Sequence, residues 1–347
     1  MVKMDFEDLD SEYDVLIIGM GTAGLMAAKS LSKNLKVAVI DYRRMPRHKA
    51  CSGIIVKQGH SLLRELAPPD YIYRTPKFLD ITYLDWTNNK EHKSKKHFLN
   101  TDRKTFDEWL YNKVSVRANV HMCENTRLVD FYSSKGKFVI SALKSEEDNL
   151  KIIFSKTVIG ADGANSTIRN KLFNKQIPFY VAVQEIIDSK KTPDTAYFIF
   201  DQEITDHYCW IIPKNNQIEL GAALLPSKSN EKFELFKNKV KEKMGIQGKG
   251  TFESALILRP RDKHDVCLGK GRVLLAGEAA GLITPSGAEG ISNALCSGLN
   301  AARVINSNPD ELVRAYEREC NDILDRFDKK FEKAELIRDP SKRAEFF

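Results

Sequence analysis

The sequence has few features that would link it to a membrane, a metal ion or a disulfide framework. Its apolar runs fall short of the roughly 18 residues that a membrane-spanning helix needs. The six cysteines include no Cys-x-x-Cys pair, so neither a zinc site nor a set of disulfides is expected. The seven histidines show no metal-ligand spacing. A Gly-x-Ser-x-Gly nucleophile elbow and internal repeats are also absent, which excludes several common classes of enzyme and repeat protein.

The composition is that of an ordinary folded protein. The 347 residues are enough for about two domains, and 42% hydrophobic with 29% charged residues is a usual balance. The net charge of +7 is spread over many segments, so we expect no nucleic-acid partner. The first twelve residues are acidic and lack the apolar core of a secretory signal, so we expect a cytoplasmic protein.

The strongest signal is a glycine-rich turn directly after the first apolar run. Residues 13–18 are followed by Gly19-Met20-Gly21-Thr22-Ala23-Gly24. Gly19 permits a tight turn, Gly21 leaves room for phosphate oxygens, and Gly24 lets helix and strand pack closely. The free N–H groups of the following helix then face an anion. The motif predicts a site for the pyrophosphate of a dinucleotide.

The second apolar run, residues 36–40, ends at Asp41, about twenty residues after the glycines. A carboxylate at the tip of this strand can accept hydrogen bonds from an adenosine ribose, and it disfavours a 2′-phosphate. A bound dinucleotide is therefore favoured over a glycine turn without a ligand. The reason is that the glycines occur together with a strand, a helix, a second strand and an acid at the expected spacing.

Further along the chain, two kinds of pattern alternate. Helical spacing is predicted over residues 101–116, 233–244, 292–305 and 308–339, and short strands over 120–122, 127–132, 138–143 and 151–160. The strand-rich block 179–225 predicts an antiparallel sheet. We therefore predict an α/β fold in which a discontinuous Rossmann-type nucleotide-binding domain (11–75, 99–175 and 255–307) carries an inserted antiparallel-sheet substrate domain (76–98 and 176–254). A C-terminal helix is predicted in 308–347.

Two further strands end in an acid followed by small residues. Asp162 and Gly163 follow one apolar strand and open a helix, which Asp162 could simply cap. The other strand leads through small residues into a helix that begins at Ile291; its exit carries Gly277, Glu278, Pro285, Gly287 and Gly290. Backbone there can approach a flat ligand, and the helix dipole favours a carbonyl or an anionic ring by about 0.3–1 kcal/mol.

Together these motifs resemble those of the flavoprotein hydroxylase superfamily, and within it the geranylgeranyl reductase family with its short CbrA-like members. The resemblance spans residues 13–305 and implies FAD as the cofactor. It places Gly19, Gly21, Thr22, Ala23, Gly24 and Asp41 at the adenosine end, Asp162 and Gly163 in the middle, and Gly277, Glu278, Pro285, Gly287, Gly290 and Ile291 at the isoalloxazine end. Arg103 resembles an arginine that approaches FAD in this family, the alternative being an exposed helix arginine.

Glu278 departs from the family pattern, which usually has aspartate there. Its carboxylate is one methylene farther out, so a hydrogen bond to the ribityl chain needs a shifted backbone or a different rotamer. A carboxylate acceptor is still present, and FAD binding is still expected.

Two segments resemble the reactive end of the family's site. Residues 49–53 partly match a Lys-x-Cys-Gly segment beside the flavin, with Ser52 as an extra residue. Cys51 either donates a proton to a substrate carbon or shapes the pocket. Residues 208–213 resemble a Tyr-x-Trp-x-Phe-Pro strand over the flavin, which implies that Tyr208, Trp210 and Pro213 bind substrate. Tyr208 and Trp210 lie two residues apart, so they form one aromatic wall for an apolar or planar substrate, or else fill the core between domains.

The resemblance implies an FAD-dependent oxidoreductase that reduces a carbon–carbon double bond of an apolar substrate, isoprenoids being one candidate class, by hydride transfer from reduced flavin. An FAD- and NAD(P)H-dependent aromatic monooxygenase is the alternative. A flavin-binding protein that acts through partner contacts of its C-terminal helix is an alternative of another class. The reductant, NAD(P)H or a ferredoxin-type donor, stays open, as does the oligomeric state. A prenyl substrate would imply transient membrane contact.

Overall fold

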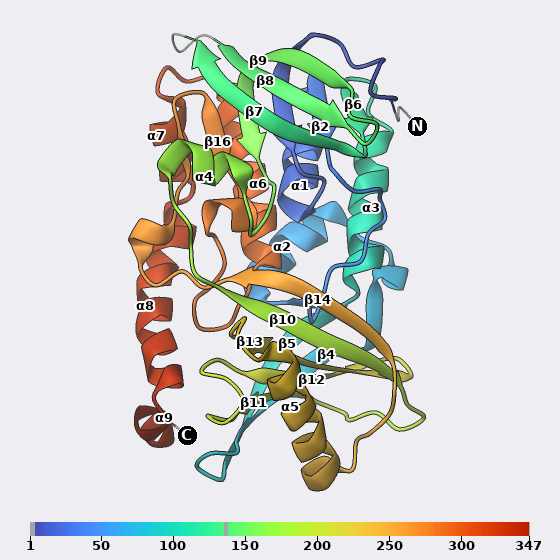
Figure 1. Ribbon diagram of the computed structural model, residues 1–347, viewed down its shortest axis with the longest axis vertical. Helices are drawn as coiled ribbons and strands as arrows, with labels where there is room; N and C mark the ends of the chain where they lie inside the picture. The colour runs from blue at the N-terminus through green and yellow to red at the C-terminus, as the bar shows by residue number, and fades with distance from the viewer. Residues whose placement is uncertain (1–3, 135–137, 347) are drawn as a thin grey trace.

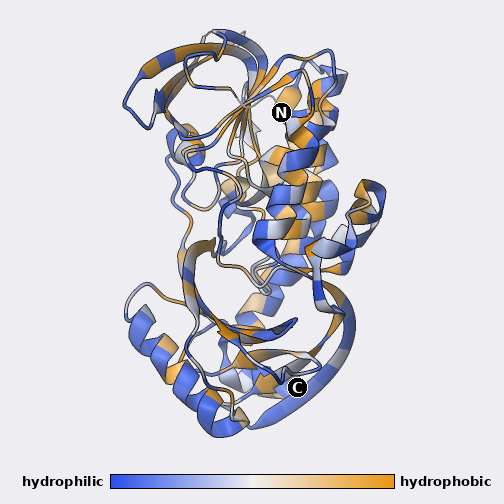
Figure 2. Cartoon of the chain, turned by 90° about the vertical axis from the view of Figure 1, so that its right-hand side faces the viewer, coloured by the Kyte–Doolittle hydropathy of each residue, from blue (hydrophilic) through white to orange (hydrophobic). Residues whose placement is uncertain are grey.

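The computed structural model describes residues 4–134 and 138–346, which form two eight-stranded sheets arranged one above the other along the long axis (Figure 1). Apolar residues concentrate in the strands and in the helices packed on the upper sheet, whereas the outer helix α5 (Ser229–Met244) is mostly hydrophilic (Figure 2). The predicted α/β class is confirmed. No helix in the described part of the chain is both long and apolar enough to cross a membrane.

The first sheet contains the predicted Rossmann-type core. Four neighbouring pairs run parallel, as expected for strands joined by helical crossovers. The sheet consists of β1 (Glu12–Ile18), β2 (Val37–Ile40), β6 (Val120–Cys123), β7 (Thr126–Ser134), β8 (Phe138–Ser145), β9 (Leu150–Gly160), β15 (Gly269–Lys270) and β16 (Val273–Leu275). Strand β1 lies between β2 and β9 and is almost wholly buried, which explains its continuous apolar run.

Helices α1 (Thr22–Ser30), α3 (Arg103–Ser115) and α6 (Ile291–Ser307) pack together beside this sheet. Glycine allows α1 and α6 to approach each other closely. A Cβ at Gly298 of α6 would come within 2.2 Å of the Ala23 carbonyl oxygen, so α6 crosses α1 at a distance that only glycine permits. This crossing places the N-termini of α1 and α6 on the same side of the sheet.

The second sheet comprises β3 (Ile54–Ile55), β4 (Tyr73–Asp85), β5 (Lys90–Thr101), β10 (Phe179–Asp188), β11 (Ala196–Phe200), β12 (Cys209–Lys214), β13 (Gln217–Leu224) and β14 (Thr251–Leu258). Its neighbouring strands are antiparallel except for one pair, since β11 runs parallel to β4. The predicted domain boundaries at 98/99 and 254/255 fall inside β5 and β14.

The two faces of the second sheet have different coverings. Helix α5 (Ser229–Met244) packs on one face, where Phe233, Phe236 and Val240 are fully buried against Leu220 and Ala222. The opposite face carries Tyr208 and Trp210 and turns toward the first sheet. This second face is therefore the one that can contribute to a site between the sheets.

The C-terminal segment forms three helices instead of the single helix predicted: α7 (Leu312–Glu319), α8 (Asn321–Arg338) and α9 (Pro340–Phe346). Helix α7 packs on α6, and the Tyr316 hydroxyl donates to the Leu275 carbonyl of β16 at 3.0 Å. Helix α8 then runs down one side of the molecule to the second sheet (Figure 1), where Ile337 joins its aromatic face. The segment thus spans both sheets.

Candidate functional site

A cavity of about 630 Å³ lies between the two sheets. The first sheet and its helices supply glycine-rich backbone to the wall, the second sheet supplies aromatic rings, and α8 supplies lysines and apolar side chains. The predicted site residues that line it are Gly21, Thr22, Ala23, Cys51, Arg103, Gly163, Tyr208, Trp210, Glu278, Gly287, Gly290 and Ile291. Segments that are far apart in the sequence therefore meet around one space.

The other predicted site residues lie behind this wall: Gly19, Gly24, Asp41, Asp162, Pro213, Gly277 and Pro285. Some of them hold the wall in place. Gly277 has φ of +60°, and a Cβ there would come within 2.9 Å of Ala23 Cβ. Pro213 is buried in β12, and its carbonyl accepts from Asn100 Nδ2 at 2.8 Å. Pro213 does not line the cavity, and its predicted contact with substrate stays a prediction.

The three glycines of the first turn have different surroundings. Gly19 has φ of +110°, and its Cβ would come within 2.4 Å of the Ala161 oxygen. A Cβ at Gly24 would come within 2.0 Å of the Gly19 oxygen. Gly21 meets only the Arg47 guanidinium, at 3.1 Å, and it begins α1 without a side-chain cap. The α1 N-terminus therefore offers open N–H groups to an anion in the cavity.

Asp41 supports the glycine turn. Its Oδ2 accepts from the Met20 amide at 2.7 Å and its Oδ1 from the Arg43 amide at 2.9 Å. The side chain is buried at the end of β2. Its predicted contact with an adenosine ribose stays a prediction, and the structure adds a second role, because this carboxylate holds the glycine turn in place.

Asp162 accepts from the first turn of a helix whose N-cap is Ser166, and it keeps one oxygen available. Oδ2 accepts from the Thr167 amide at 2.8 Å at the start of α4 (Thr167–Phe173). Oδ1 is buried and has no hydrogen-bond partner within the described ranges. Burial raises the pKa of this carboxyl. Gly163, which lines the cavity, has φ of +79° and open space where a Cβ would lie. An orphaned acceptor beside bare backbone fits a cofactor hydroxyl or N–H group.

Arg103 is buried in the cavity wall and is not an exposed helix arginine. Its Nη2 lies 2.8 Å from Asp107 Oδ2 and 3.1 Å from Oδ1, and the Thr22 hydroxyl donates to Asp107 Oδ1 at 3.1 Å. Burial opposes the charge of Arg103, but Asp107 and then Cys51 outweigh it and hold the pKa of Arg103 above its ordinary value. This group links the α1 N-terminus to α3 and places a fixed cation at the wall.

Glu278 joins three parts of the site through one carboxylate. It lies in the short helix η3 (Gly277–Ala280), where Oε1 accepts from the Leu258 amide of β14 at 3.0 Å and Oε2 from Lys49 Nζ at 3.1 Å. The longer side chain therefore reaches across to the second sheet. Its predicted contact with the cofactor stays a prediction.

Arg169, which was not among the predicted site residues, joins the Asp162-Gly163 turn to the segment that begins at Gly277. Its Nη1 donates to the Ala279 carbonyl at 2.9 Å and its Nη2 to the Ala164 carbonyl at 2.7 Å. The residue is buried. The sequence held one clue to this role, because Arg169 follows the Asp162-Gly163 turn by only six residues. An arginine at such a place can donate to carbonyl groups that a glycine turn leaves without partners.

The aromatic wall is a row of side chains across adjacent strands. Phe198 of β11 pairs in register with Trp210 on one side and with Tyr83 of β4 on the other. Tyr208 packs on Phe198 with ring centroids 5.0 Å apart, and its hydroxyl donates to the Gly287 carbonyl at 2.7 Å. Tyr83 and Phe198 were not among the predicted site residues, although both lie in the segments predicted to form the antiparallel-sheet domain. The wall both lines the cavity and packs the region between the sheets.

Lysines gather along one edge of the cavity. Lys330 of α8 pairs with Glu289 at 3.2 Å, while Lys333 and Lys96 lie nearby. Burial, and then the charges of Lys330 and Lys96, lower the pKa of Lys333. This edge therefore has a positive potential next to an apolar wall.

The FAD-binding domain family matches residues 12–328, which is most of the chain. The open α1 N-terminus, the orphaned Asp162 oxygen and the glycine-lined wall fit that cofactor. The chain belongs to this FAD-binding family. FAD is therefore its cofactor, and the chain is a member of the FAD-dependent oxidoreductase superfamily.

Relatives of this FAD-binding protein include Protein CbrA of Escherichia coli O6:H1 and of Shigella sonnei. Each is 29% identical over 314 residues, which is 88% of this chain and 85% and 88% of theirs. A geranylgeranyl bacteriochlorophyll reductase-like protein from Thermoplasma acidophilum is similar in structure, with a TM-score of 0.80 and 18% identity over 94% of this chain and 88% of that one. These matches confirm the resemblance noted in the sequence.

Other enzymes share the fold of this FAD-binding protein. The p-nitrophenol 4-monooxygenase PnpA of Pseudomonas putida has a TM-score of 0.77 and 16% identity, covering 97% of this chain and 92% of PnpA. The flavin-dependent halogenase CmlS has a TM-score of 0.74 and 20% identity, covering 93% of this chain and 64% of CmlS. At such identities the likeness shows the fold alone, so the reaction has to be argued from the cavity.

Proposed function

We propose that this FAD-binding protein reduces a carbon–carbon double bond of an apolar substrate. The observation that carries the proposal is the placement of Cys51. Its thiol is partly exposed and lines the same cavity as the aromatic wall and the glycine-rich backbone of the cofactor motifs. A proton donor, an apolar surface and a cofactor cradle are thereby available to one ligand.

In its reduced form, FAD held by the glycine-rich wall would supply the hydride for one carbon of the double bond. The other carbon takes a proton, so the product gains two hydrogens, and the electrons come from NAD(P)H or a ferredoxin-type donor. Cys51 supports the proton step because its side chain is the thiol that lines the cavity, within reach of a ligand bound there. The hydrogen of the Tyr208 hydroxyl is already donated to the Gly287 carbonyl, and burial raises the pKa of Tyr208. Cys51 is therefore the better donor of the two.

The aromatic wall supports an apolar substrate and leaves a second candidate function. Tyr83, Phe198 and Trp210 present ring faces and edges over several strands, which suits an extended apolar chain, such as an isoprenoid, lying along the sheet. The same row also suits a planar aromatic ring. An aromatic monooxygenase that uses NAD(P)H and oxygen is thus the second candidate.

Anaerobic photoreduction of the holoprotein, followed by addition of candidate alkenes including prenyl chains, separates the two functions. Reoxidation by an alkene with formation of the saturated product is expected. Cys51→Ser should slow this reoxidation, whereas Cys296→Ser, which changes a partly exposed thiol outside the cavity lining, should not. Reoxidation only by oxygen, with a hydroxylated product, would overturn the reductase proposal in favour of the monooxygenase.

A further inference from the structure

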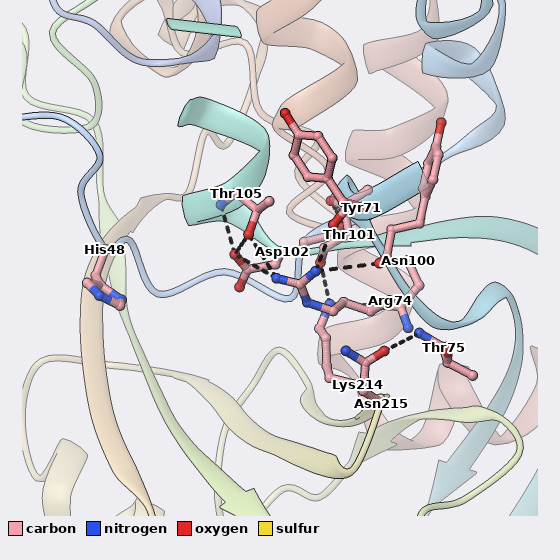
Figure 3. A network of polar contacts seen from close by, with 12 residues as sticks. His48, Tyr71, Arg74, Thr75, Asn100, Thr101, Asp102, Thr105, Lys214 and Asn215 are labelled. Atoms are coloured by element: carbon pink, nitrogen blue, oxygen red, sulfur yellow. Dashed lines mark hydrogen bonds and ion pairs between the residues drawn. The ribbon is translucent and has the colours of Figure 1, made fainter. Parts of the chain in front are cut away.

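Lys214, at the end of β12, is a buried lysine with all its donors in use. Its ammonium donates to the Ser52 carbonyl at 2.6 Å, the Thr101 carbonyl at 2.6 Å and the Asn100 side-chain oxygen at 2.8 Å. Figure 3 shows the last two contacts within a larger polar network at the end of β5. Because an ammonium has three protons, no donor is left over. The lysine therefore joins β12 to two other segments.

One of these segments is the loop 49–53, which carries Cys51. Lys214 holds this loop at Ser52, and the Thr101 hydroxyl donates to the Gly53 carbonyl at 2.6 Å on the next residue. Gly53 has φ of +63°, and a Cβ there would lie 2.1 Å from the Thr101 oxygen and 3.2 Å from Lys214 Nζ. The loop passes so close to β5 and Lys214 that it has little freedom to move while these contacts hold.

A buried acid connects the same lysine to the aromatic wall. Glu219 of β13 is buried, pairs in register with Ile212, and accepts from Trp210 Nε1 at 3.3 Å. Burial lowers the pKa of Lys214 and raises that of Glu219, and each group opposes this shift in the other. The buried lysine therefore lies next to the Cys51 loop, and the buried acid lies next to the Trp210 ring.

We propose that Lys214 is a positioning residue of the cavity, through which the second sheet holds the loop 49–53 and places Cys51 beside the substrate. Glu219 fixes the orientation of the Trp210 ring by accepting a hydrogen bond from its indole N–H. The second sheet thereby fixes the distance between the Cys51 loop and the aromatic wall. The kinetic consequence rests on the proposed reductase function, but the placement of the loop can be tested without it.

Hydrogen exchange in Lys214→Met tests the placement. Methionine keeps much of the side-chain volume but leaves three acceptors without their donor, so exchange in the peptide covering residues 49–56 should rise about tenfold. Lys151→Met is the matched control. Lys151 lies on β9 of the first sheet and also donates to three carbonyls, those of Phe6, Glu7 and Leu9. It should leave residues 49–56 unchanged. A rise confined to β12 and β13 in Lys214→Met would overturn the proposal.

Alkylation of Cys51 gives a second measurement and covers the case in which Lys214→Met folds poorly. Lys214→Arg keeps the charge and the donors, so iodoacetamide should modify Cys51 at a rate between those of the wild type and Lys214→Met, with the methionine variant fastest because its loop is released. Equal rates in all three proteins would refute the proposed role. Cys296, which is partly exposed in α6, reports whether the whole protein has loosened.

Kinetics then separate positioning from binding once a substrate is known. Lys214→Met should lower kcat with little change in KM, whereas Trp210→Ala should raise KM. Lys214→Met combined with Glu219→Gln should recover part of the loss, because no buried charge is left without its partner. If the exchange and alkylation results hold but no alkene is reduced, the reductase proposal fails and the placement by Lys214 stands.

Discussion

The indole ring of Trp210 lies on Gly221 of the neighbouring strand. The two residues are opposite each other in the β12–β13 register, and a Cβ at Gly221 would come within 2.1 Å of Trp210 Cε2 and 2.4 Å of Nε1. Glycine at this position therefore makes the space in which the aromatic wall lies flat against its own sheet. Any larger side chain has to push the ring toward the cavity.

Gly221→Ala should destabilise the protein by about 1–3 kcal/mol, the usual range for overpacking a core. Thermal unfolding with intrinsic tryptophan fluorescence measures both the loss and the displaced ring. In a Trp210→Ala background the same substitution should have little effect, because the ring that it meets is gone. An equal loss in both backgrounds would show that Trp210 is not the residue displaced.

Gly21→Ala and Gly24→Ala should separate cofactor binding from folding. The Cβ at position 21 meets only the end of the flexible Arg47 side chain, whereas at position 24 it meets backbone at 2.0 Å. We expect Gly21→Ala to fold with nearly wild-type stability and to bind FAD at least tenfold more weakly, because the methyl group enters the space next to the α1 N-terminus. Gly24→Ala should fail to fold. Flavin fluorescence titration and thermal unfolding of the apoprotein measure the two effects, and unchanged FAD affinity in Gly21→Ala would contradict this assignment of the turn.

Glu278→Asp should weaken the contacts that tie the short helix η3 to β14 and to Lys49, even though aspartate is the family's usual residue. The shorter side chain cannot keep both the Leu258 amide and Lys49, and a hydrogen bond to a charged group contributes about 1.5–3 kcal/mol. Unfolding of the apoprotein should show a loss in this range. Lys49→Met, which removes only the ion pair, should lose less than about 1 kcal/mol. Wild-type stability in Glu278→Asp would show that these contacts contribute nothing.

His207 should make the protein sensitive to acid. The ring is buried against Tyr180 and Tyr208, and burial lowers its pKa to about 3. The folded state keeps the neutral ring, while the unfolded chain takes up a proton below its ordinary pKa of about 6.5. The contribution of His207 to stability is therefore complete above pH 6.5 and is lost as the pH falls from there toward 3.

His207→Phe should remove this dependence while keeping a ring in the same place. Between pH 7.5 and pH 5 the wild type should lose roughly 2 kcal/mol more than the variant, measured by thermal unfolding at both values. His264→Gln changes an exposed histidine and should follow the wild type. Parallel pH curves for wild type and His207→Phe would show that the buried ring is not responsible.

Arg343 ties the C-terminal helices to the second sheet. Its Nε lies 2.7 Å from Asp85 Oδ2, its Nη1 donates to the Ile337 carbonyl at 2.6 Å, and both side chains of the ion pair are almost fully buried. Arg343→Met leaves the Asp85 carboxylate buried without its cation, so a loss of about 3–5 kcal/mol is expected on denaturant unfolding. Asp85→Asn in the same background should restore part of it. No restoration would mean that lost packing, and not the charge, causes the defect.

The cofactor motif could be predicted because its information is local. The turn Gly19 to Gly24, the strand before it and the acid at Asp41 lie within thirty consecutive residues, and Gly19 and Gly24 are required by the backbone next to them. The short strands of the second sheet were predicted for the same reason, since their alternation depends only on which side chains face the core.

The pairing of those strands could not be predicted. Tyr83 and Phe198 meet because β4 runs parallel to β11, although 115 residues separate their positions. Lys214 follows Pro213 at the end of the strand-rich run and is buried, because β5 and the loop 49–53 close over it. The reach of Glu278 to Leu258 likewise depends on how the sheets are placed, and no local pattern encodes such a contact.

The amino-acid order by itself determined the α/β class and the glycine cradle for a dinucleotide, because these follow from short-range backbone geometry and from the period of apolar side chains. FAD as the cofactor followed from the resemblance of the motifs to those of a known family. Tertiary structure alone decided what faces the cofactor across the cavity: the row of Tyr83, Phe198 and Trp210, the buried lysine behind the Cys51 loop, and the α8 edge. The physical reason is that strand register and sheet placement come from the packing of distant segments, whose contacts are satisfied only when the whole chain has folded.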